Sequence, residues 1–276
     1  DIAGQIRQLA QGGRGTGSDV DQADSRVAQG RAALEQRKGE NNTAIARYIE
    51  VVGEVPVDLV QPAVPQYQRP TSEEEAVAFA LAHHPSAQAS QAFYKSRKAD
   101  AKAAEAPFYP RLDFETIGST GSNLDGAKGR DSDINPRLRM RYNVFNGLGD
   151  KARADKADEE AVAAKEDDNE QRRRIREETR VSYRNLMTAE ERLAPLKAHA
   201  VSAKQVVEGY RSQFELGKRS LLDLLDVQNE LQQALLGETD GTFRVLLSNY
   251  ELISSQGVLL DNFGIKPMAA KGRAGN

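Results

Sequence analysis

The longest pattern in the sequence is a run of helix-favouring residues over positions 149–216. The run is rich in Ala, Glu, Lys, Gln and Arg, which favour helix at nearly every position. After Gly149 it has no glycine before Gly209, and its one proline, Pro195, predicts a kink. A helix of about 67 residues would be roughly 100 Å long, which is too long for a compact globule.

A second helical pattern follows the short turn 217–220 and extends over residues 221–263. The shortness of the turn predicts an antiparallel helical hairpin. Gly237 and Gly241 should weaken the second helix locally. Apolar residues recur along it at steps of three or four positions, or multiples of these: Leu221, Leu224, Leu231, Leu235, Leu246, Tyr250, Ile253 and Leu260. Two helices this long cannot bury two seams against each other alone, so we expect further helices, from this chain or from copies of it.

Upstream of this hairpin, residues 71–106 predict a helix that is broken at His84-Pro85. Thr71 or Ser72 would cap it, because carboxylates follow in the first turn.

Two alternating segments within residues 107–148 predict a β-hairpin. Apolar residues on the first strand are Leu112, Phe114 and Ile117; on the second, Leu138, Met140, Tyr142 and Val144 alternate with Arg137, Arg139, Arg141 and Asn143. Period-two alternation is typical of strands with one apolar face and one wet face. Residues 121–135 are rich in Gly, Ser, Asn and Asp and predict a long exposed loop.

The sequence also repeats itself loosely at an offset of 204 residues. Matching positions include Arg7 with Arg211, Gly13 with Gly217, Asp19 with Asp223, Ile49 with Ile253 and Gly53 with Gly257. Residues 1–53 therefore correspond to the end of an earlier repeat, with a tip loop and a returning helix from Ser18. Residues 54–70 are proline-rich and predict an extended linker, and residues 264–276 predict a disordered tail. We expect the chain to be a fragment that lacks the first repeat's own strands.

The composition mainly excludes certain partners and kinds of site. The 38 Lys and Arg residues nearly balance 41 Asp and Glu, and the formal charge of −3 argues against a nucleic-acid partner. The absence of cysteine excludes disulfides, thiolate-bound zinc and a cysteine nucleophile. No leader is visible, and no stretch approaches the ~18 apolar residues of a membrane-spanning helix.

No catalytic site or cofactor site is predicted. The glycine-rich segment 12–18 lacks the Lys-Ser/Thr ending of a phosphate-binding loop, and His83 and His84 have no third metal ligand in view. No Ser/His/Asp set or carboxylate pair falls in a plausible pocket. The sequence therefore predicts a protein that is not an enzyme.

Three segments in this order resemble the TolC family of outer-membrane channel proteins. They are Pro107-Phe108-Tyr109-Pro110-Arg111-Leu112, Tyr142-Asn143-Val144-Phe145-Asn146-Gly147, and the tip from Phe214 to Asp226. The resemblance covers about residues 1–265, including the earlier Ser18-Asp19-Val20 tip. It implies a homotrimer with a twelve-stranded outer-membrane β-barrel and a periplasmic helical tunnel, to which each chain contributes four strands and two helical hairpins.

The resemblance also assigns roles to particular residues. Asp223 and Asp226 would form an acidic ring at the periplasmic entrance, although from the sequence alone they favour a solvated helix start. Arg219 would bond to Ser18 and Asp19 as a gate latch, where the alternative is an exposed ion pair of small effect. Phe214 replaces a tyrosine that the family usually has there. Wet-face arginines Arg137, Arg139 and Arg141 would line the barrel lumen.

The expected function is an exit duct from an inner-membrane pump across the periplasm and the outer membrane. Its partners would be sister subunits, a periplasmic adaptor protein, an inner-membrane ABC or proton-driven transporter, and outer-membrane lipid. The tip pattern leans towards type I protein secretion, with small-molecule or drug efflux as the alternative. A third hypothesis, from another class, is a periplasmic coiled-coil adaptor or scaffold without a pore.

Overall fold

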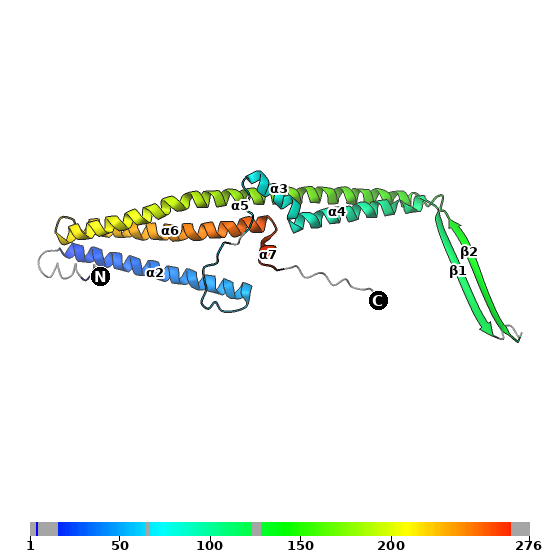
Figure 1. Ribbon diagram of the computed structural model, residues 1–276, viewed down its shortest axis with the longest axis horizontal. Helices are drawn as coiled ribbons and strands as arrows, with labels where there is room; N and C mark the ends of the chain where they lie inside the picture. The colour runs from blue at the N-terminus through cyan, green and yellow to red at the C-terminus, as the bar shows by residue number, and fades with distance from the viewer. Residues whose placement is uncertain (1–3, 5–15, 65–66, 123–127, 266–276) are drawn as a thin grey trace. The chain divides into compact units, whose positions relative to one another are not determined.

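The computed structural model describes residues 4, 16–64, 67–122 and 128–265, and in them the chain is mainly α with one β-hairpin (Figure 1). The expected fold class is therefore confirmed. The elements in chain order are α2 (Gly17–Val52), α3 (Glu73–His83), α4 (Pro85–Ala104), a 3-10 turn (Ala106–Phe108), β1 (Arg111–Ser122), β2 (Arg130–Arg141), α5 (Gly149–Glu215), α6 (Leu221–Ser255) and α7 (Leu259–Asn262). Of the tail predicted over residues 264–276, residues 266–276 lie outside the described residues, and so does the first tip loop up to residue 15.

The chain divides into two units. Residues 1–64 and 192–242 form the first, which holds α2 and the tip portions of α5 and α6. Residues 65–191 and 243–276 form the second, which holds α3, α4, the β-hairpin and the remaining portions of the two long helices. No helix in the described part of the chain has both the length and the apolar character needed to cross a bilayer.

In the first unit, Gly241 allows α6 to approach α5 closely. A Cβ at this position would lie 2.7 Å from Leu196 Cδ1, which is closer than carbon atoms can pack. Leu196 follows Pro195, and α5 continues through this proline as one helix. A glycine inside a helix costs about 1 kcal/mol in propensity relative to alanine, so here the close contact of two helices offsets that cost.

The β-hairpin is longer than the alternation pattern predicts. β1 pairs antiparallel with β2 from Arg111↔Arg141 to Ser122↔Arg130, so most of the predicted loop 121–135 is strand. The hydroxyls of Thr120 and Ser132 lie 3.1 Å apart across the pair. Polar, turn-favouring residues thus form strand here because cross-strand hydrogen bonds satisfy their backbone.

The register also corrects the two faces of the hairpin. Residues directly opposite each other share a face, which places Ile134 beside Gly118 on the face of Leu112 and Phe114. Ile117 pairs with Asn135 and belongs to the other face, contrary to the expectation. Tyr142, Val144 and Phe145 follow the end of β2 and are exposed.

The returning helix is shorter than the predicted 221–263. α6 ends at Ser255, and Gly257 adopts a left-handed φ of 77°. The amide of Val258 then donates to the Ile253 carbonyl at 3.3 Å, which closes the helix end before α7. α2 ends in the same way, since Gly53 has a φ of 86° and its amide donates to the Ile49 carbonyl at 2.8 Å.

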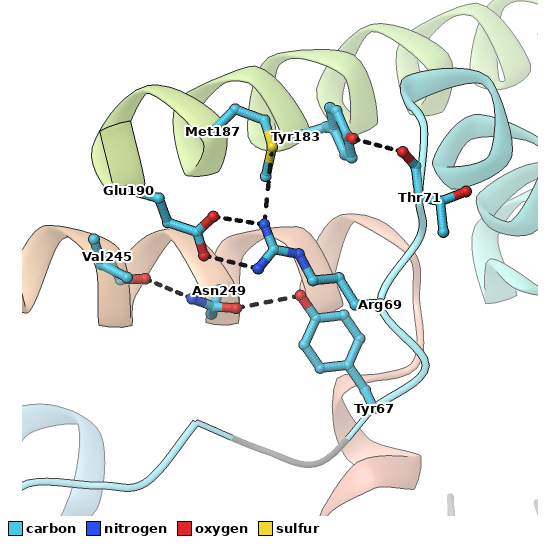
Figure 2. Close-up of polar contacts among 8 residues, drawn as sticks. All are labelled: Tyr67, Arg69, Thr71, Tyr183, Met187, Glu190, Val245 and Asn249. Carbon is cyan, nitrogen blue, oxygen red and sulfur yellow. Dashed lines mark hydrogen bonds and ion pairs between the residues drawn. The ribbon is translucent and has the colours of Figure 1, made fainter. Parts of the chain in front are cut away.

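A polar strap ties the end of the linker to the helices of the second unit (Figure 2). Arg69 Nη1 and Nη2 donate to the two carboxylate oxygens of Glu190 on α5, at 2.8 and 2.6 Å. Tyr67 Oη donates to Asn249 Oδ1 on α6 at 3.2 Å. Burial raises the pKa of the Tyr67 hydroxyl, so it remains a hydrogen-bond donor at neutral pH. The strap bonds the chain to both long helices just before α3 begins.

We predict that Gly257→Ala destabilises the protein strongly. A Cβ there would lie 2.6 Å from Pro85 Cδ and 2.7 Å from His84 Cα, and the left-handed backbone itself costs a non-glycine residue about 1–2 kcal/mol. Thermal unfolding of the complete protein, followed by far-ultraviolet circular dichroism, measures the effect. Gly53→Ala is the matched control, because Gly53 shares the left-handed φ but a Cβ there meets nothing within 4 Å. Equal losses in the two variants would show that the contact with His84 and Pro85 is unimportant.

Candidate functional site

The tip turn between α5 and α6 is built from local hydrogen bonds. Gly217 has a φ of 71°, and the amide of Lys218 donates to the Gln213 carbonyl at 2.8 Å. The amide of Gly217 donates to the Phe214 carbonyl at 2.9 Å. These bonds satisfy carbonyl groups that would otherwise be left unpaired at the end of α5. Glycine is needed at position 217 because side chains rarely tolerate that backbone conformation.

Ser220 and Asp223 cap the start of α6 reciprocally. The Asp223 amide donates to Ser220 Oγ at 3.2 Å, and the Ser220 amide donates to Asp223 Oδ2 at 3.2 Å. Both bonds satisfy backbone donors that a helix start leaves free. Bonding to Ser220 lowers the pKa of the Asp223 carboxyl. Asp223 is therefore ionised at neutral pH and also fixes the geometry of the tip.

Asp226 lies one turn further along α6, on the same side as Asp223. Its Oδ1 accepts from Arg26 Nη2 of α2 at 3.2 Å, and its side chain remains 64% exposed. An exposed pair of this kind contributes about 0–1 kcal/mol. Sequence reasoning missed Arg26, whose contact with Asp226 spans 200 positions.

Arg219 is held within its own hairpin. Its Nε donates to Gln213 Oε1 at 2.9 Å, and its guanidinium lies 4.4 Å from the centroid of the Tyr210 ring. Ser18 is exposed near the start of α2, and among the residues described here no hydrogen bond joins it to Arg219. The Asp19 side chain lies outside the described part. Sequence reasoning missed Tyr210 and Gln213, which precede Arg219 in the last turns of α5.

Phe214 packs where the family usually has a tyrosine. It lies against a small apolar cluster that joins α2 to the tip, with Ala23 and Leu221 buried at its centre and Val20 and Leu225 beside them. The ring therefore has a packing role in this chain.

A groove of about 540 Å³ adjoins this cluster in the first unit. Its lining combines apolar residues, amide side chains and two arginines from α2 and the hairpin: Ala23, Arg26, Val27, Gln29, Gly30, Ala33, Arg211, Leu225, Gln228, Asn229 and Gln232.

The wet face of the β-hairpin, in the second unit, carries a network of ion pairs. Asp113 binds Arg111 Nε and Arg141 Nη2, each at 2.8 Å. Glu115 and Arg139 lie 3.3 Å apart. Arg137 stands opposite Glu115 in the register. The three arginines predicted for the lumen are thus brought to one face, opposite Leu112 and Phe114.

Within the described ranges, no group of three or more His, Asp or Glu side chains is arranged to hold a metal ion.

Comparison with known proteins decides the family. Residues 77–257 match the family model described as outer membrane efflux protein. That match covers more than half of the chain. The chain belongs to the outer membrane efflux protein family.

The outer membrane efflux protein BepC of Brucella suis is 27% identical over 261 residues. The alignment covers 92% of this chain and 56% of BepC, so the chain spans about half the length of that relative. Among solved structures, the outer-membrane channel OprN is 22% identical, with a TM-score of 0.74 over 92% of this chain and 58% of OprN. VceC of Vibrio cholerae is 16% identical, with a TM-score of 0.74 over 93% of this chain and 62% of VceC. These structural matches show the TolC-like fold.

Membership in the outer membrane efflux protein family confirms two of the predictions made from the sequence. The family consists of channel proteins and not of enzymes, and it places the protein in the outer membrane of a Gram-negative bacterium.

We predict that Ser220→Ala raises the pKa of Asp223 part of the way towards its ordinary value, because the side chain of Ser220 is the largest cause of the lowered pKa and is lost, whereas the bond from the Ser220 amide to Asp223 Oδ2 remains. In the unmodified protein the lowered pKa means that the Asp223 contribution to stability is present above the ordinary aspartate pKa. That contribution is lost as the pH falls through the lowered value. Titration of isotope-labelled aspartate by NMR measures the shift. Ser212→Ala is the control, because Ser212 Oγ donates only to the Glu208 carbonyl within α5; an unchanged Asp223 titration in Ser220→Ala would contradict the capping role.

Proposed function

We propose that this efflux protein forms, with two sister subunits, a duct that carries substrates from an inner-membrane pump through the periplasm and the outer membrane. Family membership is the observation that carries this proposal. A periplasmic adaptor protein and an ABC or proton-driven pump would be its partners. The opposed faces of the β-hairpin support the proposal independently of the comparisons.

The β-hairpin suits a wall between lipid and water. Leu112, Phe114 and Met140 are exposed on one face and would be stabilised by lipid. An arginine on a lipid-facing strand surface costs about 2–4 kcal/mol at the bilayer midplane. Arg137, Arg139 and Arg141 on the opposite face therefore favour an orientation towards a water-filled pore.

The tip supports a controlled entrance. We propose that Asp223 and Asp226 of three chains form an acidic ring of six carboxylates, which would favour cations and bind multivalent ones. We also propose that Arg219 acts as the gate latch towards Ser18 and Asp19. Its guanidinium has five N–H donors, and Gln213 occupies one of them, so donors remain for a second partner.

Two classes of cargo fit such a duct. Small-molecule efflux agrees with the family description and with the name of the BepC relative. Type I protein secretion is the second candidate, and the tip pattern from Gly217 to Asp226 favours it.

We predict that the complete protein conducts ions when it is reconstituted in a planar bilayer, because a duct of this kind encloses water. In cells that lack the gene, resupplying it should restore export of a small dye if the cargo is small molecules. Restored secretion of the substrate of a co-expressed type I transporter, with dye export unchanged, would identify the secretion branch. A reconstituted protein without conductance would favour a periplasmic scaffold and contradict the proposal.

We predict that Asp223→Asn with Asp226→Asn, in the complete protein, abolishes block of the conductance by trivalent cations added at the periplasmic side. Asparagine keeps the size of each side chain and removes its charge, so binding of multivalent cations should be lost. Asp240→Asn on the exposed part of α6 is the control and should leave the block intact. Persistent block in the double variant would show that these carboxylates do not form the ring.

A further inference from the structure

The wet face of the β-hairpin presents arginines to water and keeps carboxylates beneath them. We propose that four arginines, Arg111, Arg137, Arg139 and Arg141, form a basic belt that selects anionic substrates, with organic anions that carry carboxylate or phosphate groups as the favoured class. The inference rests on the proposed function, because a belt of this kind acts on cargo only if the hairpin lines a pore.

The pairing register places all four arginines on one face. Arg111 stands opposite Arg141, Asp113 opposite Arg139, and Glu115 opposite Arg137. Alternation along each strand brings these six positions to the same side of the sheet. The belt is therefore a continuous patch at the end of the hairpin from which α5 continues.

The ion pairs leave the guanidinium groups outermost. The Asp113 side chain is 18% exposed, whereas those of its partners Arg111 and Arg141 are 76% and 60% exposed. Arg139 is likewise more exposed than its partner Glu115. An approaching solute therefore meets positive groups first, with the negative groups below them.

The belt also keeps charge and donors in excess. Two carboxylates face four arginines, which leaves a net charge of about +2 per chain, and the three chains of the proposed trimer would triple it. Each guanidinium has five N–H donors, and the hydrogen bonds of Arg111 and Arg141 to Asp113 use one donor each. In the described part of the chain, Arg137 has no ion pair at all and is exposed.

Guanidinium groups suit oxyanions in particular. Their planar pairs of N–H donors match the two oxygens of a carboxylate or phosphate, which gives directional binding in addition to attraction. Rings of arginine or lysine are typical of anion and phosphate pores. This chemistry gives the belt a preference among anions, beyond a simple excess of positive charge.

An acidic residue nearer the hairpin turn does not cancel the belt. Asp133 stands four positions beyond Arg137 on the same face. At the rise of a strand, four residues span roughly 14 Å, which exceeds the ~8 Å screening length at physiological salt. The face is therefore divided into separate zones, of which the belt is the positive one.

The test uses the complete protein in a planar bilayer with a potassium chloride gradient, and measures the reversal potential. Arg137→Gln removes a charge that holds no ion pair, so it should preserve the fold. We expect the ratio of anion to cation permeability to fall by about twofold or more, the factor for one unit charge acting across roughly 8 Å of water. Citrate added to one chamber should also compete less well with chloride for the pore of this variant.

Two further variants test the direction in which the permeability ratio changes. Arg130→Gln removes the same charge from the same strand but on the apolar face, and should leave the permeability ratio unchanged. Glu115→Gln removes a carboxylate from the belt and should shift the ratio towards anions.

The outcomes separate the inference from the proposed function. If Arg137→Gln conducts with the permeability ratio of the unmodified protein, the belt is overturned and the duct remains. Equal shifts of that ratio in Arg137→Gln and Arg130→Gln would have the same meaning. A protein that conducts no current would overturn both.

Discussion

Thin apolar seams are the constraint on which the helical part of this structure depends. In the first unit, Ala200 and Ala203 of α5 pack against Ala234 of α6, with Leu231 at the edge. In the second unit, Ala80 and Ala87 pack against Ile175 of α5. Small side chains bring helix backbones close together but bury little area each, and burial stabilises in proportion to area.

The same constraint explains why apolar surface remains outside the seams. Val181, Val201, Leu236 and Leu247 on the two long helices are each roughly half exposed. A helix that carries apolar residues on more than one side needs a partner for each side. Sister subunits of the proposed trimer would supply these partners, so exposed surface of this kind is consistent with an assembled duct.

Local signals allowed much of the structure to be predicted from the sequence. The turn at Gly217 depends on residues within a few positions, and so do the break at His84-Pro85 and the start of α3 at its cap, Ser72. Helix-favouring composition similarly indicated α5, and hydrophobic periodicity indicated α6 and both strands. The chemistry that fixes these features lies in the segments themselves.

Features that depend on distant partners could not be predicted. The extension of β2 back to Arg130 is stabilised by its pairing with β1, although its own composition favours a loop. The partner of Asp226 is Arg26, which no spacing rule connects to it. The end of α6 at Gly257 is an intermediate case. Gly257 is a local signal for the end of the helix, whereas the apolar stripe predicts that the helix continues to Leu260. The close approach of His84 and Pro85 to Gly257 favours the end at the glycine.

The repeat separates two roles that carboxylates have at the tip. α2 and α6 begin at Gly17 and Leu221, and these positions are related by the same offset as the sequence repeat. Under this offset Thr16 and Asp19 correspond to the capping pair Ser220 and Asp223, so the residue types of the cap recur in the sequence of both repeats.

The residues one turn later differ between the repeats. Gln22 and Arg26 occupy the positions that correspond to Asp226 and Glu230, and Arg26 pairs directly with Asp226. The Asp223 carboxylate has a role in folding, because it caps the start of α6. Asp226 makes no such cap, and it is the more exposed member of its ion pair with Arg26. In the proposed ring its negative charge would therefore face solvent, but Arg26 would partly offset it, because a neighbouring guanidinium offsets the field of the carboxylate that it binds.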